Sequence, residues 1–254
     1  MSTEIAATMG QIHGRGVQRS SMADRTLLRL SATLLAAGVL LSLLASMFHV
    51  NSEQANDHVA AFTAYAQSST WTAAHLGQFL GMAVLIAGML VMFVALNVHT
   101  GMLGWAGRLS ALSAAVALAL YGVLQAVDGV ALKQAVDAWM RAPDAEKAAR
   151  FASAEAIRWL EWSLRSYHSV MLGLSLVLFA IVIVGTARLP RPIGYLMGVS
   201  GLAYIAQGWV LGAEGFSENN TIPTLLGIVS LLVWSIWFVI SAWRMQEVVH
   251  PPAG

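Results

Sequence analysis

Long uninterrupted apolar stretches recur along the chain, separated by short polar segments. A helix that crosses the hydrocarbon core of a membrane needs about 20 mostly apolar residues, because the core is ~30 Å thick and each residue rises ~1.5 Å. Arg29, near the beginning of the first stretch, is the one charged residue in them. The pattern predicts six transmembrane helices, at 27–48, 76–98, 109–127, 169–187, 193–211 and 222–242.

The composition agrees with a membrane location. Hydrophobic residues make up 57% of the 254 residues and charged residues only 11%, whereas soluble domains carry about 25% charged residues. The mean hydropathy of +0.67 argues against a secreted or cytosolic globular enzyme, since its surface would lack the charges that face water. We therefore predict an all-α polytopic membrane protein, a bundle of six transmembrane helices in contact with the lipid bilayer.

Net charge and cysteine content exclude several classes of function. The net charge of +1 provides no basic patch that would neutralise phosphates, so no nucleic-acid partner is expected. The absence of cysteine excludes disulfides, thiolate metal sites, iron–sulfur clusters and cysteine nucleophiles.

Basic residues gather on one side of the predicted bundle. Arginines precede or begin the first span, occupy the links after the second and fourth spans, and follow the sixth. The loops 49–75 and 212–221 on the opposite side contain no Lys or Arg. Because positively charged loops stay in the cytoplasm, we predict a cell (inner) membrane protein with both termini cytoplasmic.

This topology divides the chain into three parts. They are a cytoplasmic N-terminal tail (1–26), the transmembrane bundle (27–244) and a cytoplasmic C-terminal tail (245–254). The first 24 residues mix Gly, Ser, Thr and Arg, and such a segment is expected to be disordered or loosely attached.

The outer segment 128–168 is the most charged part of the chain, with six basic and six acidic residues. It is rich in helix-forming residues, and Pro143 followed by Asp144 is typical of a helix start. The segment predicts a helical hairpin between the third and fourth transmembrane helices. It either extends both helices or folds as an amphipathic hairpin onto the membrane surface, and it is a candidate docking site for a protein partner.

Several polar residues are expected near one plane at the outer boundary. His75 opens the second span, Asp128 ends the third and His168 opens the fourth, while Glu161 lies on the helical stripe of His168. Imidazole and carboxylate groups bind zinc, iron, copper or haem when cysteine is absent. The candidate metal ligands are therefore His75, Asp128, Glu161 and His168. His75 and His168 as a pair would suit a haem between the second and fourth helices.

Three glutamines lie slightly deeper in the spans. Gln78 follows His75 by three residues, Gln125 precedes Asp128 by three, and Gln207 lies in the fifth span. An amide inside the hydrocarbon core must face the bundle interior or a cavity to find partners. Together with the four candidate metal ligands, these glutamines predict an outward-facing polar pocket for a cofactor, metal or small ligand.

The same residues allow a plainer interpretation. Polar residues at a membrane boundary commonly contact water or cap helices, which is how we interpret His49. Asp128 would then cap its helix or form a salt bridge with Lys133 or Arg165. Glu161 would be neutralised by Arg158 and Arg165, which lie three and four residues from it. The glutamines would serve as separate interhelical hydrogen bonds.

Three segments resemble uncharacterised bacterial multi-pass membrane proteins. They are WTAAHLGQFLG at 71–81, QAVDGVALKQAVDAW at 125–139 and AIRWLEW at 156–162. The resemblance extends over about two thirds of the chain. It implies a six-helix architecture and draws attention to His75, Asp128 and Glu161, and it implies no particular activity.

Three functional hypotheses follow from the sequence. The first is a membrane protein whose outward-facing pocket binds a cofactor, metal or small ligand. The second is a membrane enzyme that acts on a lipid-soluble substrate by metal-assisted or acid–base chemistry, with Asp128 and Glu161 as the carboxylate pair. The third is an accessory or structural subunit of a membrane complex that docks a partner through 128–168. A transporter is less favoured, because no acidic residue lies deep in a span and no helix is broken midway.

Overall fold

The computed structural model describes residues 2–49 and 56–245, which are helical apart from short links and contain no strand. The predicted all-α fold is confirmed, and six helices are long and apolar enough to cross a membrane. The elements, in chain order, are α1 (Ser2–Ser46), α2 (His58–Gln67), α3 (Trp71–Leu96), α4 (Gly101–Ala126), a π-helix η1 (Val127–Leu132), α5 (Lys133–Arg141), α6 (Asp144–Thr186), α7 (Arg191–Glu214), a 3₁₀-helix η2 (Glu218–Asn220) and α8 (Thr221–Arg244).

The hairpin 128–168 extends two transmembrane helices, which is the first of the two predicted arrangements. α4, η1 and α5 follow one another without a break, and α6 continues in the opposite direction for 43 residues. A helix of that length spans about 65 Å, roughly twice the ~30 Å of the hydrocarbon core. A large part of α6 therefore lies outside the membrane.

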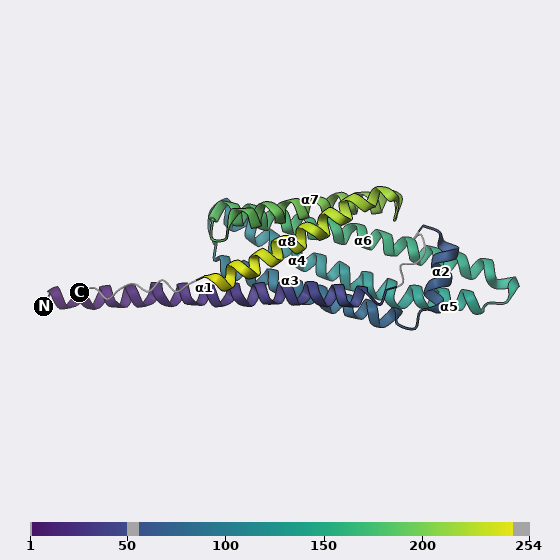
Figure 1. Ribbon diagram of the computed structural model, residues 1–254, viewed down its shortest axis with the longest axis horizontal. Helices are drawn as coiled ribbons and strands as arrows, with labels where there is room; N and C mark the ends of the chain where they lie inside the picture. The colour runs from purple at the N-terminus through teal and green to yellow at the C-terminus, as the bar shows by residue number, and fades with distance from the viewer. Residues whose placement is uncertain (1, 50–55, 246–254) are drawn as a thin grey trace.

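The prediction for the first 24 residues was wrong in one respect. The segment is not irregular, because α1 begins at Ser2. Figure 1 shows this part of α1 projecting beyond the bundle. α1 continues from this segment into the first span without a break.

At the end of the bundle opposite the hairpin, the two ends of the chain's transmembrane region lie together. As labels of position in the molecule, we call this end the inner end and the hairpin end the outer end. The C-terminal end of α8 lies beside α1, at the end of the molecule opposite the hairpin (Figure 1). Arg29 on α1 donates hydrogen bonds to the carbonyl oxygens of Ala242 (3.3 Å) and Met245 (3.1 Å). A cation at a helix C-terminus satisfies carbonyls that have no partner within the helix. Arg29 therefore caps the C-terminal end of α8.

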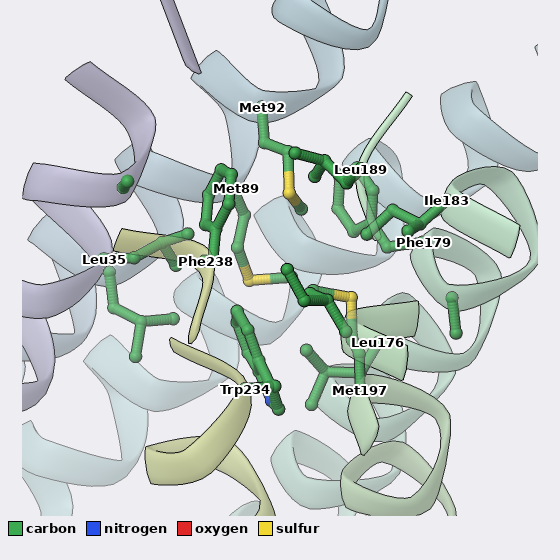
Figure 2. Close-up of a cluster of buried hydrophobic side chains, with 14 of the residues drawn as sticks. Leu35, Met89, Met92, Leu176, Phe179, Ile183, Leu189, Met197, Trp234 and Phe238 are labelled. Atoms are coloured by element: carbon green, nitrogen blue, oxygen red, sulfur yellow. The ribbon is translucent and has the colours of Figure 1, made fainter. Parts of the chain in front are cut away.

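The transmembrane core is formed by side chains from six helices, with α4 contributing the small Ala114 and Ala117. Figure 2 shows Leu35, Met89, Leu176, Met197 and Trp234 converging from α1, α3, α6, α7 and α8. α1 packs mainly on α3, and α6 packs on α7 and α4. The bundle thus has two tightly packed parts that meet through α3–α4 and α1–α8 contacts.

Glycine allows the close approach of α6 and α7. A Cβ atom at Gly201 would lie 2.6 Å from the carbonyl oxygen of Gly173 and 2.9 Å from the backbone nitrogen of Val177. No ordinary side chain fits at such distances. Small residues at helix interfaces in membranes bring backbones into contact in this way.

A second, smaller cluster of buried residues lies at the outer end, which we call the outer cluster. It forms where α2, which the sequence analysis did not predict, packs on the hairpin (Figure 1). Lys133 caps the C-terminal end of α2 by donating hydrogen bonds to the carbonyl oxygens of Tyr65 (3.1 Å) and Ala66 (2.8 Å). Burial raises the pKa of the Tyr65 hydroxyl, so this group stays neutral. The guanidinium of Arg158 lies over the Tyr65 ring. The outer cluster consists of Ala61, Phe62, Tyr65, Trp71, Leu132, Val136, Trp139 and Ala154.

α2 covers only part of the hairpin, and the rest of the hairpin surface is exposed. Trp159 and Leu160 remain 54% and 51% exposed on α6. The docking of a protein partner on the hairpin stays a prediction, and these two side chains, with the exposed Val130, Met140 and Tyr167, offer apolar surface for it.

Candidate metal centre

His75 lies one turn into α3 and is 1% exposed. Its Nδ1 lies 2.7 Å from the carbonyl oxygen of Trp71, four residues earlier. A carbonyl accepts and does not donate, so Nδ1 carries a proton and Nε2 presents a lone pair in the neutral ring. This is the arrangement by which a protein orients a metal-binding histidine through its second nitrogen.

Asp128 lies in the π-helix η1, and its neighbours hold that segment against α3. The Trp71 indole nitrogen donates to the carbonyl oxygen of Asp128 (2.9 Å), and the Thr72 hydroxyl donates to that of Gly129 (2.8 Å). A π-helical turn shifts the register of backbone hydrogen bonds and is frequent at functional sites. Side chains of α3 here bind carbonyls of this turn, so the two elements are fixed relative to each other.

Gly129 permits the close contact between η1 and α3. A Cβ atom at this position would lie 2.5 Å from the Cβ of His75. The absence of a side chain at Gly129 therefore lets the imidazole lie beside Asp128.

The imidazole and the carboxylate form a close buried pair. Nε2 of His75 lies 3.1 Å from Oδ2 of Asp128, which is an ion pair when the ring is protonated. In the neutral ring Nε2 has no proton to donate, and Oδ1 of Asp128 is a buried atom without a hydrogen-bond partner in the described chain. A buried polar atom without a partner costs about 1–3 kcal/mol, so a cation between the two groups would find a lone pair on each.

His49, just after α1, is the third member of the group. One ligand atom from each of His49, His75 and Asp128 lies within 4.8 Å of the other two. The ring centroids of His49 and His75 are 5.1 Å apart. Ligands about 2.0 Å from a zinc ion in tetrahedral geometry are roughly 3.3 Å apart, so a small closing movement would bring these atoms to bonding positions.

Glu161 is held by two arginines, as its spacing from them indicated. Arg158 donates to one carboxylate oxygen (2.9 Å) and Arg165 to the other (2.8 Å). Arg165 also lies 3.4 Å from Oδ2 of Asp128 and therefore links the two carboxylates. Glu161 is thus not among the group of His49, His75 and Asp128, and it acts here as the counter-ion of the arginines.

His168 lies apart from this group, deeper on α6. Its Nδ1 donates to the carbonyl oxygen of Ala117 on α4 (2.9 Å), and its ring lies 4.6 Å from that of Tyr121. It lines a cavity between the helices together with Arg165 and Gln207. Among the described residues, the predicted ligand pair of His75 and His168 is not brought into one metal-binding group.

The three glutamines separate into two places. Gln125 donates to Gln78 (3.4 Å), which donates to Ser46 on α1 (3.2 Å). Gln207 accepts from Ser169 (3.2 Å) and donates to Thr224 on α8 (2.8 Å). These are interhelical hydrogen bonds, which was the plainer interpretation of the glutamines, and Gln207 in addition borders the cavity.

Sequence reasoning identified His75 and Asp128 and left out His49. His49 stands at the end of a span, where polar residues are common, and the sequence offers no partner for it at helical spacing. The roles of Trp71 and Gly129 were also missed, because both depend on the π-helical turn. Helical spacing did predict the ion pairs of Glu161 with Arg158 and Arg165.

Comparison of the chain with protein-family models, with curated protein sequences and with solved structures found no match.

Proposed function

We propose that this integral membrane protein binds a transition-metal ion at the outer end of its bundle, through His49, His75 and Asp128. The observation that carries the proposal is the buried group itself: Nε2 of His75 lies 3.1 Å from Asp128, whose Oδ1 has no hydrogen-bond partner, within reach of a second imidazole. Two imidazoles and one carboxylate form a donor set that suits zinc. Iron and copper accept the same ligand types.

Such a site leaves room for chemistry as well as for binding. Three protein ligands leave a fourth position open, and a metal ion held in this way activates water or polarises a carbonyl group. The protein's own residues supply orientation. The Trp71 carbonyl fixes the His75 ring, and Arg165 brings a positive charge beside Asp128.

The acid–base alternative has less support from the geometry. It uses Asp128 and Glu161 as a carboxylate pair, but both oxygens of Glu161 accept hydrogen bonds from arginines. A water molecule or substrate would have to displace an arginine to reach either oxygen, although burial raises the pKa of the Glu161 carboxyl above its usual value. The metal site is the stronger basis for an activity at this end of the molecule.

Metal content tests the proposal directly. The purified protein is stripped with a chelator, incubated with Zn²⁺ and desalted, and its zinc is measured by mass spectrometry. We expect about one zinc ion per chain in the wild-type protein and at least a tenfold loss of affinity in His75→Ala and Asp128→Asn. Each of these substitutions removes one of the three protein ligands and leaves the metal ion with an incomplete coordination shell.

The matched control is His99→Ala, which removes an exposed histidine in the link between α3 and α4. This variant should keep the wild-type zinc content. Asp128→Asn has nearly the volume of the wild-type residue, and its thermal unfolding reports whether the fold is kept. Wild-type protein that binds no Zn²⁺, Fe²⁺ or Cu²⁺ would contradict the proposal, as would equal zinc binding by His75→Ala and His99→Ala.

A further inference from the structure

A cavity of about 240 Å³ lies between the two tightly packed parts of the bundle. α1 and α3 form one side of it, and α6, α7 and α8 form the other, with Tyr121 of α4 between them. α1 and α8 touch at the inner end and separate toward the outer end (Figure 1). The cavity is lined by residues of both helices where they separate.

The lining changes from polar to apolar along the helix axes. On α6, Arg165, His168 and Ser169 lie toward the outer end and Leu172 lies deeper. On α1, Ser46 lies toward the outer end and Val39 lies deeper. Seven residues of helix correspond to about 10 Å. The deep part is otherwise mostly apolar, with Tyr204 of α7 beside Met82, Leu85, Ile228, Leu231 and Leu232.

The polar end offers hydrogen bonds without a net charge. Arg165 lies between the carboxylates of Glu161 (2.8 Å) and Asp128 (3.4 Å), which compensate its positive charge. The Nδ1 proton of His168 is donated to the Ala117 carbonyl, so Nε2 remains as an acceptor on a residue that borders the cavity. Arg165 supplies N–H donors at the same end.

We propose that this cavity binds a single-chain lipid with an uncharged headgroup that carries both a hydroxyl and a carbonyl oxygen. The hydroxyl donates to Nε2 of His168, and the carbonyl accepts from Arg165. The chain occupies the aliphatic end between α1 and α8, where it enters from the bilayer. A buried polar group is stable only with its partners. An anionic headgroup would find no positive charge free to pair with it, because the carboxylates already compensate Arg165. A lipid without a hydroxyl would leave Nε2 of His168 without a donor.

The inference goes beyond the metal site and does not require the metal to be bound. Arg165 connects the two places, because it contacts Asp128 and borders the cavity. The headgroup of a bound lipid would therefore lie beside the proposed metal centre.

The test uses a monoacylglycerol with a photoreactive diazirine at the end of its acyl chain. The purified wild-type protein is irradiated with this probe in detergent, and labelled residues are mapped by mass spectrometry. We expect labelling of the deep residues Leu172, Leu231 or Leu232. Unlabelled monooleoylglycerol should compete at least tenfold better than methyl oleate, which lacks the hydroxyl, or oleate, which is charged.

Two variants and one control localise the binding. His168→Phe keeps a ring but removes the acceptor, and Leu172→Trp fills the cavity; both should reduce labelling at least tenfold. Leu174→Trp is the matched control, because Leu174 is 38% exposed and two residues away on the same helix. Equal labelling of Leu172→Trp and Leu174→Trp would overturn the proposal, as would stronger competition by oleate.

The chelator-treated protein separates the two proposals. We expect it to bind the probe as the zinc-loaded protein does, within about twofold. Labelling of a protein that fails to bind any metal would leave this inference standing and refute the metal site. A zinc-binding protein that is not labelled in the cavity would do the opposite.

Discussion

Gly129 controls how closely the imidazole of His75 approaches the π-helical turn. Its missing side chain leaves the space that a Cβ atom would fill, 2.5 Å from the Cβ of His75. The two buried atoms of the candidate metal centre lie next to this contact. The site thus depends on a residue that contributes no ligand.

Gly129→Ala is therefore expected to weaken zinc binding. The added methyl group would move α3 away from η1 or rotate His75, and overpacking of this kind costs about 1–3 kcal/mol. Competition with a chromophoric chelator measures the affinity, which should fall at least tenfold, and thermal unfolding measures stability. Gly198→Ala is the control, because its Cβ would lie at an ordinary 3.4 Å from Ala180. Wild-type affinity in Gly129→Ala would show that the contact does not position His75.

Residue-level chemistry was partly readable from the sequence. Polar residues at the ends of predicted spans indicated that His75 and Asp128 would lie at one depth, and the structure places them 3.1 Å apart. Helical spacing predicted the ion pairs of Glu161. His49 could not be assigned, because its distance from the others depends on how α1 packs against α3, which no local pattern encodes.

α2 and the hairpin show what a whole element adds at the outer end. The ten residues of α2 lie within a loop that the sequence analysis treated only as lacking basic residues. Three of its residues are buried in the outer cluster: Ala61, Phe62 and Tyr65. A short helix is marginal on its own, so α2 depends on packing against the hairpin, and sequence patterns in the loop do not reveal that contact. The same holds for η1, where the π-helical turn follows from tertiary hydrogen bonds.

Lys133→Met tests how α2 is held. Its ammonium group donates to two carbonyls at the C-terminal end of α2 and to Asp137 (2.8 Å). Loss of these bonds should destabilise α2 by about 1–2 kcal/mol. Hydrogen exchange measured over His58–Gln67 should become roughly tenfold faster. Lys147→Met is the control, because this lysine makes one 3.4 Å contact on the hairpin itself. Unchanged exchange in Lys133→Met would assign the stability of α2 to apolar packing alone.

The whole molecule combines a membrane bundle with an outer extension, and the two were predictable to different degrees. Six apolar runs are sufficient to define six helices, because only length and composition matter for crossing a membrane. Figure 1 shows the hairpin at the end opposite the C-terminal end of α8, as the three spans of α6, α7 and α8 between them require. Of the cavity between the two packed parts, the sequence singled out only the polar lining residues Gln207 and His168. The shape of the cavity could not be predicted, because it depends on the angle between α1 and α8.

The side of the membrane on which the hairpin lies is predicted from the distribution of arginines, and this prediction is open to a direct test. Because the chain contains no cysteine, single cysteines report their own position without background labelling. Glu146→Cys lies on the exposed part of the hairpin, and Thr100→Cys lies in the link between α3 and α4. In intact bacterial cells with a permeabilised outer membrane, a membrane-impermeant maleimide should label Glu146→Cys and spare Thr100→Cys, which reacts only after lysis. Positive charges resist translocation, so the arginine-bearing end is expected in the cytoplasm and the metal centre on the opposite side. Labelling of Thr100→Cys alone in intact cells would reverse this topology and place the candidate metal centre at the cytoplasmic face.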